Sequence, residues 1–272
     1  MRTKIIFKKR KLLIILIIIH LFLITLISIV GLSFNNVYSK ETHNWYVQCI
    51  AQDIIDLFLV VPLLLISGFF MLKGNLKWTY IWLGGMFYIF YTFILYCFTI
   101  HFNFLFLAYC ATLGLTFYTI VAFIISIDKK SINTLSFTVK SSKNIAWYLL
   151  IVAISFLIMW LSDIIPAIIS NQTPQTVLQG GMFTNPVQVI DLSFLLPAMF
   201  ILSISIYRGN RSASLIAPVF LSFSFVMSFA LFIMMFYMFI QNEVANMIPS
   251  ILMIILSIIG FVFFLRLKEN SL

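Results

Sequence analysis

The sequence predicts an all-α membrane protein with eight transmembrane helices, and three observations carry this prediction. First, 62% of the 272 residues are hydrophobic and 9% are charged, whereas a soluble domain is roughly 45–50% apolar and about 25% charged. Second, apolar runs of about 20 residues recur, each long enough to cross a hydrocarbon core of about 30 Å. Third, almost all basic residues fall in every second loop.

The apolar runs are expected to be helices, because in lipid a helix satisfies its own backbone hydrogen bonds and the alternating strands of a barrel are absent from the sequence. The first run, followed by NVYSK, also fits a signal peptide cleaved after Ser39, which would leave seven helices in the same orientation. The eight runs lie at 12–32, 51–72, 78–100, 103–127, 145–169, 187–207, 215–240 and 246–265.

The net charge of +9 is distributed unevenly across the predicted membrane. Sixteen of the seventeen Lys and Arg residues lie on one side, and Lys40 lies on the other. The positive-inside rule then places both termini in the cytoplasm. The basic loops orient the chain and contact anionic lipid, so we expect no nucleic-acid partner. The predicted location is the bacterial cytoplasmic membrane.

Two stretches of the chain, IIDLFLVVPLLLI and VIDLSFLLPAMFI, align with an offset of 135 residues. Over positions 55–75 and 190–210 the alignment gives seven identities without a gap. The offset is about half the chain length, which predicts a duplicated four-helix unit. Because four is an even number, both copies enter the membrane in the same direction. The expected repeats are residues 1–135 and 136–272.

Each copy places an aspartate six residues before a proline, at the outer end of its second helix. Pro62 and Pro197 lack the N–H that would bond the carbonyl four residues back, so each predicts a kink. One interpretation of Asp56 and Asp191 is architectural, since aspartate is a favoured helix N-cap. The other is functional, because acids at membrane depth are costly and mark binding sites or pathways.

Other acids are expected at the same depth. Asp53 precedes Asp56 by three residues and shares its helix face, and Asp163 lies near the outer end of the fifth helix. The uncharged loop SNQTPQTVLQGGMFTNP is long enough to fold over an outer mouth near Asp163 and Asp191. The candidate ion- or ligand-binding residues are therefore Asp56, Asp191, Asp163 and Asp53.

Metal and cofactor chemistry has little support in the sequence. His20 lies in the middle of the first helix, where a hydrogen bond to another helix is expected. Three isolated cysteines form no CxxC pair, although Cys49 and Cys97 both map near the outer face. No metal-ligand spacing, phosphate-binding loop or nucleophile motif is present, so we expect no cofactor and no metal centre. The pair Gly84–Gly85 permits close helix packing.

The segments WLGGMFYIFYTFILYCF, NFLFLAYCA and NPVQVIDLSFLLPA resemble a family of uncharacterised prokaryotic multi-pass membrane proteins. The resemblance covers about half of the chain. It implies a membrane location and no particular activity.

Two classes of function follow. In the first, the protein is transporter-like: Asp56 and Asp191 bind a cation or proton, Asp163 and Asp53 tune them, and Pro62 and Pro197 let the helices flex. In the second, it is an accessory, immunity or assembly protein whose helices pack with a membrane partner. An intramembrane enzyme is disfavoured, because no nucleophile–base pair is visible.

Overall fold

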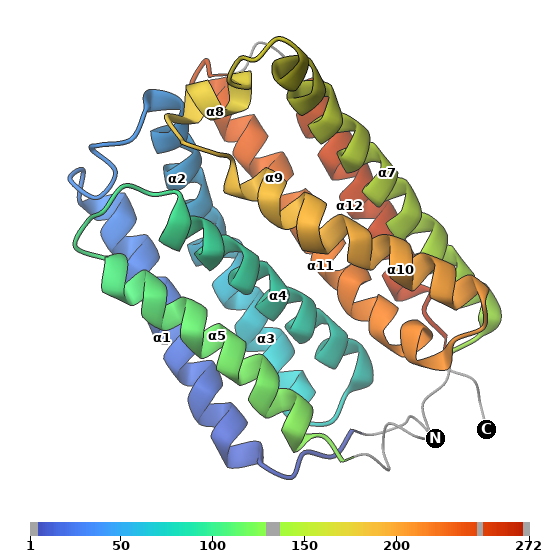
Figure 1. The fold of residues 1–272 in the computed structure, drawn as a ribbon. Helices are drawn as coiled ribbons and strands as arrows, with labels where there is room; N and C mark the ends of the chain where they lie inside the picture. Colours follow the sequence, from blue (N-terminus) through green and yellow to red (C-terminus); the bar gives the residue numbers. More distant parts are fainter. Residues whose placement is uncertain (1–4, 129–136, 244–246, 269–272) are drawn as a thin grey trace.

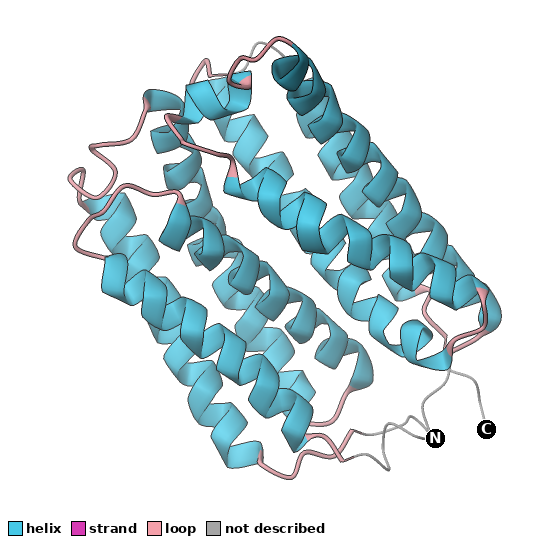
Figure 2. Ribbon diagram, in the orientation of Figure 1, coloured by secondary structure: helices cyan, strands magenta, loops and turns pink. Residues whose placement is uncertain are grey.

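The computed structural model describes residues 5–128, 137–243 and 247–268. The chain is 81% helix, and the described part contains no strand (Figure 2). Eight helical spans are long and apolar enough to cross a membrane, so the prediction of an all-α, multi-pass membrane protein is confirmed. In chain order the helices are α1 (Arg10–Ser33), α2 (His43–Ile55), η1 (Asp56–Val60), α3 (Val61–Leu72), α4 (Leu76–Phe98), α5 (Phe106–Ser126), α7 (Val139–Ile169), α8 (Gln175–Gly180), α9 (Pro186–Ile190), η2 (Asp191–Leu195), α10 (Leu196–Tyr207), α11 (Arg211–Ile240) and α12 (Ile248–Leu265).

The spans α2–η1–α3 and α9–η2–α10 each run through a short π-helical turn. In η1 the N–H of Val61 donates to the carbonyl of Asp56, five residues back, and in η2 Leu196 donates to Asp191 in the same way. A proline stands two residues after the end of each turn, at Pro62 and Pro197. A wider turn and a missing N–H are recognised causes of helix bends, and in each span the two stand next to each other.

The turns that end α3 and α10 are built alike. Gly74 and Gly209 have φ angles of +83° and +78°, in the left-handed region where side chains other than glycine are strained. The next residues, Asn75 and Asn210, accept a hydrogen bond from the third backbone N–H beyond them and cap α4 and α11. The Gly-Asn pair therefore closes one helix and starts the next.

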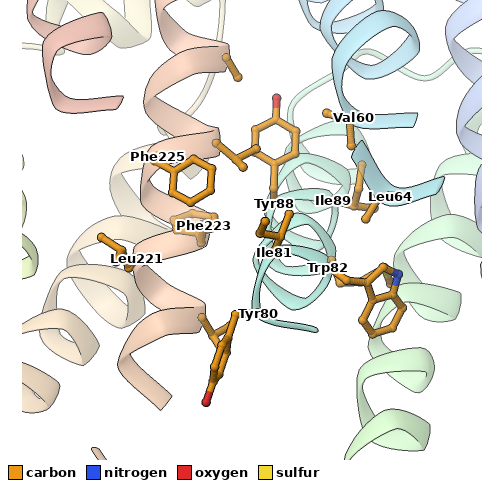
Figure 3. Close-up of a cluster of buried hydrophobic side chains, with 14 of the residues drawn as sticks. Val60, Leu64, Tyr80, Ile81, Trp82, Tyr88, Ile89, Leu221, Phe223 and Phe225 are labelled. Atoms are coloured by element: carbon orange, nitrogen blue, oxygen red, sulfur yellow. The ribbon is translucent and has the colours of Figure 1, made fainter. Parts of the chain in front are cut away.

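Helices α1 to α5 form one group and helices α7 to α12 form another, and the two groups lie side by side (Figure 1). Helix α4 packs against α11 where the groups meet. The ring centroids of Tyr91 in α4 and Phe223 in α11 lie 6.1 Å apart, and Figure 3 shows Phe223 and Phe225 among the buried side chains of this region. A Cβ added at Gly84 would stand 2.5 Å from Ser222 Cβ and 2.7 Å from the backbone nitrogen of Phe223. The two backbones therefore touch here, as the Gly84–Gly85 pair predicted.

The loops lie at two opposite ends of the bundle, and hydrogen bonds connect different loops at each end. At one end, Ile5 donates to Gly74, Lys77 donates to Leu265, and Thr138 donates to Lys268. We call it the basic end, because every described Lys and Arg except Lys40 lies there. The opposite end, which we call the loop end, holds Lys40, Glu41, His101, Gln179 and Glu243.

Candidate functional site

A cavity of about 350 Å³ lies between the two groups of helices. Residues from α2 and α4 form its wall on one side, and residues from α7, α9–η2–α10, α11 and α12 form the other. Helix α8 borders the cavity at the loop end, where Gln179 is exposed. The cavity therefore extends from the loop end into the membrane-spanning part of the bundle, between parts of the chain that are distant in sequence.

Methionine dominates the apolar lining of this cavity. Eight of the twelve methionines in the chain contribute to it. Aromatic side chains of α4, α7 and α11 complete the apolar surface. Thioether side chains are flexible and polarisable, and they adapt to ligands of different shape. The methionines are Met159, Met182, Met199, Met227, Met234, Met235, Met238 and Met253.

Asp191, in the π-turn η2, is the acid in the deeper part of the cavity lining. Its Oδ1 accepts a hydrogen bond from Tyr91 Oη at 3.0 Å, and its Oδ2 accepts one from Trp160 Nε1 at 2.8 Å. The residue is 4% exposed. Tyr91 belongs to α4 and Trp160 to α7, so this carboxyl group joins the two groups of helices and has a fixed orientation.

A polar ladder follows one face of α2 along the same cavity. It consists of Asn44, Gln48, Gln52 and Asp56, spaced four residues apart. Gln48 donates to Asn44 at 2.8 Å, and Gln52 donates to Asp56 at 2.8 Å. At the loop end, Asn44 donates to Glu243 at 3.0 Å. At the standard helical rise the ladder is about 18 Å long, so polar groups follow a route from the loop end toward the middle of the bundle.

Asp56 lies at the inner end of the ladder and is 1% exposed. It contacts Gln52, which lines the cavity, but does not line the cavity itself. Neither Asp56 nor Asp191 is a helix N-cap, because Thr42 is the N-cap of α2 and Asn185 is the N-cap of α9. The N-cap interpretation of the repeated aspartate therefore does not describe either position.

Asp53 faces away from the cavity and is fully enclosed. Its two carboxyl oxygens accept hydrogen bonds from Tyr38 and Tyr96, both at 2.8 Å. Gly31 of α1 packs directly against the carboxyl group. Burial, reinforced by the neighbouring Asp53, raises the pKa of Tyr38, which lies in the loop after α1. The Tyr38 hydroxyl therefore stays a protonated donor, and the cluster is a packed junction of α1, α2 and α4.

Asp163 positions the segment that borders the cavity at the loop end. Its Oδ2 accepts hydrogen bonds from Thr176 of α8 at 2.6 Å and from Gln188 of α9 at 2.9 Å. On the other side of α8, Thr42 donates to the carbonyl of Gln179 at 2.8 Å. The uncharged loop thus reaches Asp163 and lines the cavity that holds Asp191, as predicted, while Asp163 itself does not line that cavity.

The structure thus separates the four candidate acids: Asp191 lines the cavity, Asp56 reaches it through Gln52, Asp163 holds α8, and Asp53 is enclosed. Sequence reasoning missed the ladder, although its spacing of four residues was a readable signal. It also missed the methionine lining, whose members are scattered over α7 to α12. No protein-family model, no curated protein and no solved structure matches the chain.

Proposed function

We propose that this chain is a transporter-like protein of the bacterial cytoplasmic membrane that binds a cation in the cavity between its two groups of helices. The observation that carries the proposal is the charge of the cavity. Among the described residues, the lining includes two acids, Asp191 and Glu243, and no Lys, Arg or His. Glu243 lies 3.4 Å from His43 Nε2 at the loop end, whereas the described partners of Asp191 are the neutral side chains of Tyr91 and Trp160. A buried acid without a basic partner attracts a cation, and such groups in membrane proteins tend to mark pathways.

The proposed architecture is a pair of parallel four-helix repeats, residues 1–135 and 136–272, with the basic end in the cytoplasm. The seven identities between the copies support this. So do the two π-turns and the two Gly-Asn turns, which occupy positions offset by the same 135 residues. Transporters with parallel repeats bind substrate at the repeat interface near the membrane centre. The orientation rests on the one-sided distribution of basic residues.

In this proposal the cation enters from the loop end, follows the ladder of α2 and reaches Asp191. Asp56 contributes from the inner end of the ladder through Gln52. The π-turns before Pro62 and Pro197 supply positions where the helices can bend, so that the cavity can open toward the basic end. Asp163 acts on access by holding α8, and Asp53 stabilises the first group of helices.

Cation flux in proteoliposomes tests the proposal. Vesicles carrying the full-length protein are given an inside-negative potential, and entry of H⁺ or Na⁺ is followed with internal dyes. We expect faster entry of one of these cations than in protein-free vesicles, and its loss in Asp191→Asn. The control is Asp128→Asn, an acid that pairs with Lys8 at the basic end. Equal flux in the wild type, Asp191→Asn and empty vesicles would overturn the carrier proposal and favour an accessory role beside a membrane partner.

A further inference from the structure

We infer that the cavity takes an amphipathic organic cation: an ammonium group beside Asp191, an apolar body among the methionines, and a hydrogen-bonding group that reaches Ser224. This inference deepens the proposed function by naming the class of ligand. It rests on the proposed cation site and not on transport, so the binding experiment and the flux experiment can give different outcomes.

The position of the ammonium group follows from the open side of the Asp191 carboxylate. Each of its carboxyl oxygens accepts one hydrogen bond, from Tyr91 and from Trp160. A carboxylate oxygen offers about two acceptor positions, so each oxygen keeps one side that a cation can approach through charge attraction, with or without an N–H donor. The rings of Tyr91 and Trp160 also line the cavity, and aromatic faces attract ammonium groups through their quadrupole. An acid flanked by two aromatic rings is a suitable binding environment for a cationic nitrogen.

The position for the apolar body follows from the size and chemistry of the remaining wall. A volume of about 350 Å³ falls within the range of small-molecule sites, which is roughly 300–1,000 Å³. It exceeds what a single metal ion fills, although thioether sulfur also binds soft ions such as Cu(I). The methionines come from α7, α10, α11, α12 and the loop after α8. They form the wall on the side of the second group of helices, and four of the eight belong to α11. Such a flexible wall adapts to an organic body.

Ser224 is an independent indication that a ligand binds here. It is 3% exposed and lines the cavity, and its Oγ has no hydrogen-bond partner among the described residues. It lies thirteen residues from the start of α11, and Asp191 lies sixteen residues from the end of α10. Both are therefore roughly 20–24 Å from the basic end. An unpaired buried hydroxyl is unfavourable, and a polar group on the ligand would pair with it.

The test is binding to the full-length protein in detergent micelles, measured by calorimetry and by the shift in melting temperature. The probe is benzoylcholine, which has a quaternary ammonium, an ester carbonyl and an apolar ring. The control ligand is 3,3-dimethylbutyl benzoate, in which carbon replaces the charged nitrogen. We expect benzoylcholine to bind roughly tenfold or more tightly than this neutral isostere, as a charged contact in a buried site implies.

Two pairs of variants locate the site. Asp191→Asn is expected to remove the preference for the charged ligand, whereas Asp128→Asn at the basic end retains it. The more sensitive pair is Ser224→Ala and Ser222→Ala. Both hydroxyls lie on α11, are buried and lack a partner among the described residues, but Ser222 does not line the cavity. Both changes should leave folding intact, and only Ser224→Ala should weaken benzoylcholine binding, by several-fold.

Three results would overturn the inference: equal binding of the two esters to the wild type, equal effects of the two serine variants, or stabilisation by Ag⁺, a stand-in for Cu(I), without binding of benzoylcholine. Binding without any flux in proteoliposomes would support the ligand class and reject the carrier. Flux of H⁺ or Na⁺ without benzoylcholine binding would support the carrier and reject the ligand class.

Discussion

The contact between Gly31 and Asp53 makes a quantitative prediction for Gly31→Ala. A Cβ built on Gly31 would stand 2.9 Å from Asp53 Cγ and 2.9 Å from the Tyr38 hydroxyl oxygen. Overpacking of this kind costs about 1–3 kcal/mol. If Asp53 moves to relieve the contact, its hydrogen bonds with Tyr38 and Tyr96 weaken, at about 0.5–1.5 kcal/mol each. Alanine returns up to about 1 kcal/mol through helix propensity, so we expect a net loss of at least about 1 kcal/mol when both costs apply.

The measurement is unfolding of the purified protein in mixed micelles, with SDS as the denaturant and tryptophan fluorescence as the signal. The control is Gly114→Ala in α5, where an added Cβ meets no atom within 4 Å. That change should be neutral or stabilising. Combining Gly31→Ala with Asp53→Ala removes the carboxyl group that the added Cβ would meet, so the double variant should be more stable than the sum of the two losses predicts. A Gly31→Ala protein as stable as Gly114→Ala would refute the packing described for Asp53.

Two further predictions concern α8 and the Gly-Asn turn. Thr176→Val keeps the side-chain shape but removes the donor to Asp163, so hydrogen exchange in α8 should accelerate by roughly fivefold for a loss of about 1 kcal/mol. The control is Thr173→Val, at an exposed position. Equal exchange in the two variants would contradict the anchoring role of Asp163. Gly209→Ala should cost about 1–2 kcal/mol of unfolding free energy through its positive φ alone, because no atom lies within 4 Å of an added Cβ. Gly209→Asn should cost less, and an alanine variant with wild-type stability would show that the turn adopts another conformation.

The helices were predictable because hydropathy reports burial in lipid directly. All eight were found, and His20 makes the expected contact between helices, with Nε2 3.1 Å from Thr116 Oγ1. The start of the second helix was placed eight residues too late, at 51 instead of His43. The missed residues include Asn44 and Gln48, which face the cavity and not the lipid, so their polarity hid two turns of helix from a hydropathy criterion.

The site was less predictable, because it depends on which side chains from distant helices meet. The repeated aspartate singled out one residue that lines the cavity, Asp191, but the sequence could not say that its copy, Asp56, does not. The partners of Asp191 come from α4 and α7, 100 and 31 residues away along the chain. Tyrosine and tryptophan are abundant in this sequence, so their identity alone gave no sign of which ones reach an acid.

The π-turn η1 sets the direction in which the ladder of α2 points. It holds one residue more than a regular α-helical turn would need, and each residue of an α-helix rotates the chain by about 100°. Removing a single residue such as Val60 would allow an uninterrupted α-helix while turning Asn44, Gln48 and Gln52 away from the cavity. The number of residues in η1 therefore fixes the direction in which the polar face of α2 points relative to α3. A one-residue deletion would turn the ladder away from Asp191 although every side chain that lines the cavity is still present.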